Sequence, residues 1–198
     1  MIGGYMNDKP RPWQVLRRET IYDSPWVRLQ RADVRLPDGK IINGHHLIDY
    51  PRPAVCVVPV GDDGRLLLIE HYRFITDTIG WEAPAGRVDE GEALETAAAR
   101  ELREETGYTA AHLEYLGHYY PANGSANLTF HVYIGRGLQH VGDLTDTNEV
   151  TRMAWFTPED VWAMIDANAL RDGLALTSLL WYLARHHLNH QAPGCAEH

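Results

Sequence analysis

The sequence is poor in cysteine, in basic residues and in long apolar runs, and each shortage excludes a class of protein. Its two cysteines, Cys56 and Cys195, suggest neither a disulfide framework nor a zinc site. The 18 basic residues against 27 acidic ones give a formal net charge of −9, which argues against a broad nucleic-acid or membrane-surface contact. No apolar run approaches the length of a membrane-spanning helix, and the N-terminus lacks the apolar core of a signal peptide. We therefore expect a cytoplasmic protein with no nucleic-acid or membrane partner.

The 198 residues are enough for one domain with a small extension. We expect residues 1–52 to form a loose leader followed by a small antiparallel sheet, residues 53–190 to form the main domain, and residues 191–198 to form a tail. The sheet is indicated by three alternating runs at 13–22, 26–36 and 41–50. Pro-Asp-Gly stands between the last two runs and predicts a hairpin, because proline fixes φ and glycine accepts a positive φ.

The main domain mixes strands and helices. The apolar run 54–60 and the run 65–73 are joined by a Gly-Asp-Asp-Gly turn, and we interpret them as a hairpin in the central sheet. Further strands are expected at 80–84, 110–120, 128–138 and 150–156, and helices from near Ala93, at 158–165 and at 172–187. This order predicts an α/β fold with a mixed sheet between helices.

The most informative stretch is 86–108, GRVDEGEALETAAARELREETGY. In the helix predicted from near Ala93, Glu101, Glu104 and Glu105 fall within an arc of about 100°. Like charges four residues apart destabilise an isolated helix, and such local conflicts tend to lie at functional sites. A hard divalent cation such as Mg2+ would relieve the conflict, since it prefers oxygen ligands. The alternative is a solvated helix face with weak ion pairs to Arg100 and Arg103.

The same stretch fits the pattern G-x5-E-x7-R-E-U-x-E-E-x-G-U, where U is a bulky apolar residue. The matching residues are Gly86, Glu92, Arg100, Glu101, Leu102, Glu104, Glu105 and Gly107. Tyr108 departs mildly, being aromatic where an aliphatic residue is usual. The chain therefore resembles the Nudix hydrolases, which implies an α/β/α sandwich with a mixed sheet. The preceding three-stranded sheet resembles that of the ADP-ribose pyrophosphatase and nucleoside-diphosphate-sugar hydrolase branch, which implies a homodimer in which this sheet is exchanged between subunits.

The carboxylates of Glu101 and Glu105 are the best ligands for Mg2+, with Mn2+ as a substitute ion. The resemblance adds the backbone carbonyl of Ala85, and Gly86 would allow the sharp turn that presents it. Glu104 is expected to hold a further ion or to act on the attacking water. Arg100 is expected to orient a glutamate. Glu92, just before the helix, is expected to brace the loop.

A general base must reach the attacking water, and the acidic loop 142–149 offers Asp143, Asp146 and Glu149. Glu149 best resembles the family's loop glutamate, because it directly precedes the last strand. The alternative is a solvated acidic loop.

Features that bear on the substrate are fewer. Arg73 could pair with a phosphate, because a guanidinium matches phosphate oxygens, or it could be an exposed arginine at a strand end. Trp81 could stack on a nucleobase or belong to the core. The loop after the 110–120 strand keeps Pro121, which is expected to contact the substrate, but Asn127 stands where this branch often carries an acid. That departure leaves GDP-mannose and related sugars open as substrates.

The sequence thus favours a Mg2+-dependent hydrolase of a nucleoside diphosphate sugar, with ADP-ribose first, that yields a nucleoside monophosphate and a sugar phosphate. Two alternatives stay open: hydrolysis of another diphosphate, such as GDP-mannose, FAD, NADH or a coenzyme A derivative, and a ligand-binding regulator without turnover. The complete set of motif glutamates argues against the regulator.

Overall fold

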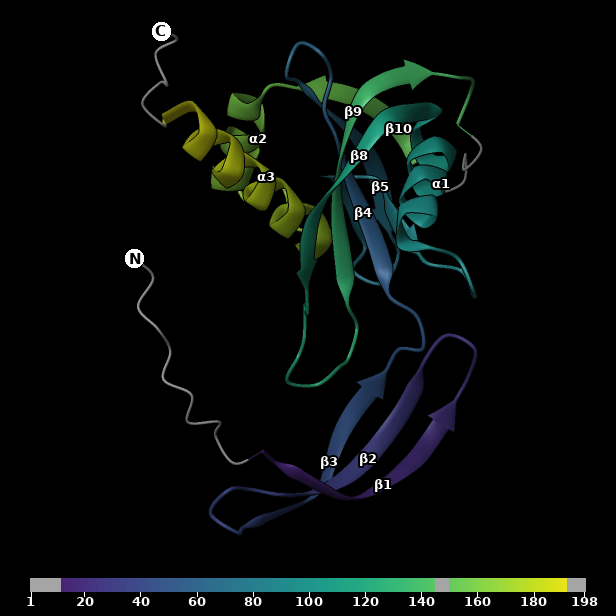
Figure 1. Cartoon of the computed structure of the whole chain (residues 1–198), viewed down its shortest axis with the longest axis vertical. Helices are drawn as coiled ribbons and strands as arrows, with labels where there is room; N and C mark the ends of the chain where they lie inside the picture. Colours follow the sequence, from purple (N-terminus) through teal and green to yellow (C-terminus); the bar gives the residue numbers. More distant parts are fainter. Residues whose placement is uncertain (1–11, 145–149, 192–198) are drawn as a thin grey trace, which may run out of the picture. The chain divides into compact units, whose positions relative to one another are not determined.

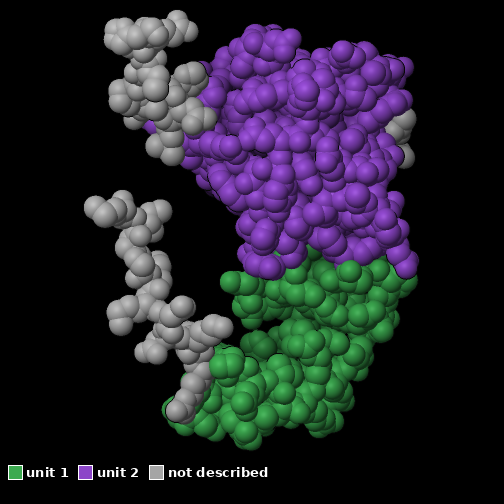
Figure 2. Space-filling view, viewed as in Figure 1, with its two compact units in different colours: residues 1–51, 122–128 green, residues 52–121, 129–198 purple. Residues whose placement is uncertain are grey.

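The computed structural model describes residues 12–144 and 150–191, which form two compact units. The first combines the chain up to Pro51 with Ala122–Leu128, and the second combines Arg52–Pro121 with the chain from Thr129 onward (Figures 1 and 2). The predicted boundary after residue 52 lies beside this division, but the predicted domain limits as a whole stay a prediction.

The first unit contains a three-stranded antiparallel sheet of order β1-β2-β3 (Figure 1). Its strands are β1 Gln14–Asp23, β2 Arg28–Arg35 and β3 Ile41–Asp49. The predicted turn joins β2 and β3, and Gly39 has the positive φ of 90° that this turn requires. The predicted N-terminal sheet is confirmed.

The segment Ala122–Leu128, which links two strands of the second unit, is bound to the end of β3. The amide of Ile48 donates to the carbonyl of Ser125 over 2.8 Å. The Asn127 side chain accepts from the amide of Tyr50 at 2.6 Å and donates to Asp49 Oδ1 at 2.5 Å. An acid at 127 would lack the donor and would face the Asp49 carboxylate. These contacts explain why an amide suits position 127 in this chain.

The second unit contains two sheets (Figure 1). One has the order β7-β4-β9-β8, with β4 Ala54–Pro59, β7 Ala85–Arg87, β8 Tyr108–Tyr119 and β9 Phe130–His140. The other has the order β10-β5-β6, with β5 Leu66–Arg73, β6 Thr78–Glu82 and β10 Val150–Phe156. The first sheet is mixed, because β4 runs parallel to β9 and antiparallel to β7.

Strand β4 shows why helices cover both faces of its sheet. All six of its residues are buried, and successive side chains point to opposite faces. Val55 and Val57 pack in a cluster with residues of α1 (Leu94–Thr106), whereas Cys56 and Val58 pack in a cluster with residues of α2 (Pro158–Asp166) and α3 (Gly173–Gln191). The predicted α/β/α sandwich is confirmed.

The predicted turn between β4 and β5 is present, because the amide of Gly61 donates to the carbonyl of Arg65 at 2.8 Å. The expectation that the two strands pair within one central sheet is wrong. The two strands belong to different sheets and share only the isolated bridge between Val60 and Leu66. All of β4 and the first four residues of β5 are buried, so their apolar runs fit a strand in either sheet and do not identify the partner strand.

Capping residues define one end of α1 and one end of α2. Gly107 closes α1 with a positive φ of 72°, and its amide donates to the carbonyl of Arg103. Thr157 caps α2 reciprocally with Asp160, and Pro158 occupies the first turn. Among the described residues, no helix combines the length and apolar character needed to cross a membrane.

Candidate active site

Helix α1 places two of its glutamates in unusually buried positions. Ala97, Ala98 and Leu102 of α1 pack against the sheet and fix the rotation of the helix. Glu101 and Glu105 are then only 9% and 3% exposed. A carboxylate is almost never this buried without a partner, because it loses the solvation of its charge.

Glu101 lies directly against the backbone of Gly86. A Cβ built on Gly86 would be 2.1 Å from Glu101 Oε1, which is far inside van der Waals contact. Position 86 therefore accepts only glycine while the carboxylate keeps this place. The neighbouring residue contributes the second contact between loop and helix, because the amide of Ala85 donates to Glu105 Oε2 at 2.8 Å.

Arg100 joins the loop to the glutamates of the helix. Its guanidinium donates to both carboxylate oxygens of Glu92 at 3.0 Å, to Glu101 at 2.8 Å and to Glu104 at 3.1 Å. It also donates to the carbonyl of Arg87 at 2.9 Å. The hydrogen bonds to Glu92 are the main reason that the pKa of Arg100 is raised, although desolvation opposes them. Such contacts suit the predicted role of Arg100 in orienting glutamates.

Glu92 also accepts from the amide of Asp89 at 2.9 Å, so it closes the loop before α1. The Glu104 side chain is 43% exposed and is the most accessible of the three helix glutamates with a predicted role in metal binding. These contacts agree with the predicted division between a bracing Glu92 and a reactive Glu104, and both roles stay predictions.

The charge balance at Glu101 fits a divalent cation. Burial raises the pKa of Glu101, and the charges of Glu104 and Glu92 add to this, whereas the contact with Arg100 opposes it. A cation beside the carboxylate would offset the cost of its burial. Carboxylate and carbonyl oxygens form the donor set that Mg2+ prefers, so Ala85, Glu101 and Glu105 could hold this ion. As placed in the described part of the chain, no three His, Cys, Asp or Glu residues converge on a common metal position.

Of the three acids predicted as candidates for the general base, one lies among the described residues. Asp146 and Glu149 lie outside the described residues, and Asp143 is exposed shortly before that gap. Pro121, predicted to touch the substrate, is exposed at the end of β8.

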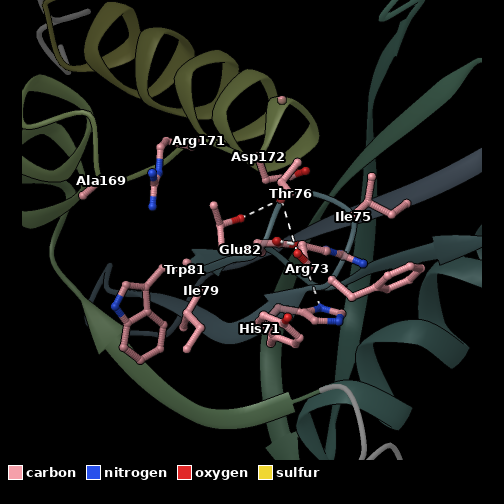
Figure 3. A pocket seen from close by; sticks show the side chains of 15 residues that line it. His71, Arg73, Ile75, Thr76, Ile79, Trp81, Glu82, Ala169, Arg171 and Asp172 are labelled. Carbon is pink, nitrogen blue, oxygen red and sulfur yellow. Dashed lines mark hydrogen bonds and ion pairs between the residues drawn. The ribbon is translucent and has the colours of Figure 1, made fainter.

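Arg73 and Trp81 both line a cavity of about 830 Å3 in the second unit (Figure 3). Strands β5 and β6 and the segment 169–173, which leads into α3, form its walls. The cavity carries charges of both signs, from Arg73, Glu82, Arg171 and Asp172.

Within this cavity, Arg73 forms a paired contact with the buried Glu82. The Arg73 Nε lies 3.0 and 3.2 Å from the two carboxylate oxygens, and Nη2 lies 2.5 Å from Oε2. Partial burial opposes the charge of Arg73, but the bonds to Glu82 outweigh it and raise the pKa of Arg73, with smaller contributions from Asp172 and Glu105.

Trp81 serves the core as well as the cavity. Its ring packs edge-on against Phe156 with centroids 4.9 Å apart, and the guanidinium of Arg152 lies 4.9 Å from the ring centroid. Trp81 thus packs against the core and also lines the cavity, while stacking on a nucleobase stays a prediction.

Sequence reasoning missed Glu82, Arg171 and Asp172. Glu82 could have been noticed, because an acid between apolar residues at the end of a short strand is costly unless it is paired. Arg171 and Asp172 carried no signal, since charged residues before a helix are common.

Two family descriptions match the chain. Residues 50–176 match the NUDIX domain, and residues 13–47 match the nucleoside diphosphate sugar hydrolase N-terminal domain. The chain belongs to the Nudix family. The prediction of a Nudix hydrolase is confirmed at this level.

Characterised relatives extend over most of the chain. A CMP-5'-(N-acetyl-N-hydroxy-3-aminopropyl)phosphonate hydrolase from Streptomyces rubellomurinus is 33% identical over 166 residues, which are 84% of this chain and 77% of that protein. An ADP-ribose pyrophosphatase from Bacillus subtilis is 30% identical over 161 residues, which are 80% of this chain and 86% of that protein. The crystal structure of an ADP compounds hydrolase has a TM-score of 0.78 at 23% identity, covers 91% of this chain and 96% of its own, and supports the fold.

Proposed function

We propose that this Nudix hydrolase cleaves the pyrophosphate bond of ADP-ribose in a Mg2+-dependent reaction that gives AMP and ribose phosphate. The observation that carries the proposal is the pair of buried carboxylates, Glu101 against Gly86 and Glu105 on the amide of Ala85. Burying two acids to 9% and 3% exposure is costly for their charged forms, and a bound cation would offset that cost. The relative named ADP-ribose pyrophosphatase supports the choice of substrate.

In this proposal Glu101, Glu105 and the carbonyl of Ala85 hold Mg2+, with Mn2+ as a substitute. The bound ion would neutralise phosphate charge and supply an acidified water. Arg100 fixes Glu101 and Glu104 through hydrogen bonds of 2.8 and 3.1 Å, so the acids keep their geometry as charge shifts during the reaction. Glu104 is the accessible acid that holds a further ion or accepts a proton from water.

The general base is assigned to Glu149, with Asp143 and Asp146 as alternatives in the same loop. A base on a loop outside the helix can approach the attacking water from its own side. Of these three acids, Asp143 is the one that lies among the described residues, and its side chain is exposed.

We place the sugar diphosphate in the cavity lined by Arg73 and Trp81. Its volume of about 830 Å3 lies within the range of small-molecule sites. Arg73 is held by Glu82 and keeps one edge of its fork for phosphate oxygens. Trp81 offers its aromatic ring for stacking on the nucleobase. Pro121 does not line this cavity and is assigned to a contact with a part of the substrate outside it.

A second candidate substrate comes from the relative with 33% identity, whose name describes a CMP-linked phosphonate. A cytidylyl compound would place the same phosphorus anhydride at the metal and a different base in the cavity. GDP-mannose, FAD, NADH and coenzyme A derivatives remain alternatives of the same reaction type. We also propose a cytoplasmic location and a homodimeric state. Sedimentation at several protein concentrations would test the homodimer.

Turnover of a substrate panel with Mg2+, with the products separated by chromatography, tests the proposal. The panel contains ADP-ribose, ADP-glucose, GDP-mannose, CDP-linked compounds, NADH and FAD. AMP and ribose phosphate as the products of the best substrate would support it. A cytidylyl preference would select the second candidate, and binding without turnover of any compound would select the regulator.

A further inference from the structure

A cluster of two histidines and one tyrosine lies on the β8–β9 hairpin, separate from the glutamates of α1. His118 of β8 lies directly opposite His131 of β9 in the antiparallel register. The Tyr115 hydroxyl lies 3.3 Å from His118 Nδ1 and 3.0 Å from His131 Nδ1. Two imidazole nitrogens thus converge on one oxygen atom.

We propose that His118 and His131 form a binding site for a late first-row divalent cation such as Zn2+, completed by the Tyr115 oxygen or by water. Imidazole nitrogen suits Zn, Cu and Ni, whereas carboxylate oxygen suits Mg. The site therefore differs in chemistry from that of Glu101 and Glu105, with which it shares no residue.

The spacing of the two rings fits a shared ion. With metal–nitrogen bonds of about 2.1 Å and each nitrogen about 1.1 Å from its ring centre, two imidazoles on a tetrahedral ion have centroids about 5 Å apart. The centroids of His118 and His131 are 5.5 Å apart, and the ring planes differ by 33°. Small rotations of the side chains would close this difference.

One side of the histidine site is exposed to solvent, and the other side packs against more buried residues. His118 and Tyr115 are exposed, so an ion can enter from solvent. His131 is partly buried, and Tyr115 packs against the buried Tyr133 with centroids 5.2 Å apart. Because no third His, Cys, Asp or Glu among the described residues joins the two histidines, binding must depend on both of them.

The test measures Zn2+ binding to the full chain by calorimetry, in excess Mg2+ so that carboxylate sites hold the harder ion. His118→Ala and His131→Gln are compared with the wild type. His112→Ala is the matched control, since His112 is an exposed histidine on the same strand that lies opposite Arg136. Circular dichroism of each variant verifies that it is folded, and Co2+ absorption in the visible range reports tetrahedral coordination.

We expect one Zn2+ per chain that is lost, or weakened at least about 10-fold, in both variants and kept in His112→Ala, since even outer partners of a metal site contribute about 10-fold to 100-fold in affinity. Unchanged affinity in a folded His118→Ala or His131→Gln would overturn the proposal, as would the absence of Zn2+ binding to the wild type. The readout is independent of hydrolysis, so the result stands whether or not the proposed activity is found.

Discussion

The Glu101 carboxylate occupies the space that a side chain at Gly86 would fill, with 2.1 Å between Glu101 Oε1 and an added Cβ. The loop that contains Gly86 and helix α1 therefore fit closely together at this contact. The loop must bring its backbone close to the carboxylate, and only glycine permits that approach.

Gly86→Ala is expected to reduce turnover at least about 100-fold, because the added methyl group displaces the Glu101 carboxylate that we assign to Mg2+. Overpacking of this kind also destabilises by about 1–3 kcal/mol, which thermal unfolding would measure. Gly124→Ala is the control, since an added Cβ there meets nothing within 4 Å. Equal activity of the two variants would contradict the account.

Glu104→Gln is expected to lower kcat at least about 100-fold with little change in stability. Glutamine keeps the shape but loses the charge, and the side chain is 43% exposed, so folding depends little on it. Glu95→Gln, an exposed acid in the first turn of the same helix, is expected to keep full activity. A fall of the same size in both variants would point to net charge as the cause and would refute a specific role for Glu104.

Arg73→Ala is expected to weaken substrate binding and to destabilise the fold, because it leaves the 5% exposed Glu82 without its charged partner. We expect a loss of about 1–3 kcal/mol, less than for a fully buried pair since the arginine is partly exposed. Adding Glu82→Gln should restore most of the stability but not the KM. Full recovery of KM in the double variant would show that Arg73 does not contact substrate.

Cys56 is expected to resist thiol reagents in the folded protein. Burial raises the pKa of its thiol to about 12, so the reactive thiolate is scarce at mildly alkaline pH. In a Cys195→Ser chain, where Cys56 is the only cysteine, a colorimetric thiol assay should detect almost no reaction until denaturant is added. Prompt reaction of the native chain with one equivalent of reagent would contradict the burial of β4.

The motif helix and the mixed order of strands and helices could be predicted from the sequence, because each depends on residues near one another in the chain. The partner of β5 could not be predicted. The apolar patterns of β4 and β5 fit a strand in either sheet, and only tertiary packing separates them. The contact of Arg73 with Glu82 depends on the pairing of β5 with β6.

The histidine pair was hidden for a more specific reason. Tyr115 and His118 are three positions apart, so regular alternation would place them on opposite faces of β8. The register shifts between Tyr115 and Gly117, and this irregularity puts both side chains beside His131. Gly117, with a positive φ of 153°, lies at this shift, and an isolated glycine within a strand is the one sequence signal that could have indicated it.

The central claim is that the buried glutamates of α1 hold the cation for pyrophosphate cleavage. Its most direct test is Mg2+-dependent hydrolysis of ADP-ribose by the wild type and by Glu105→Gln, with both proteins shown to be folded. We predict Mg2+-dependent turnover by the wild type and a loss of at least about 100-fold in the variant, which keeps the shape of the side chain on the amide of Ala85 but not its charge. Undiminished hydrolysis by the folded variant would contradict the account.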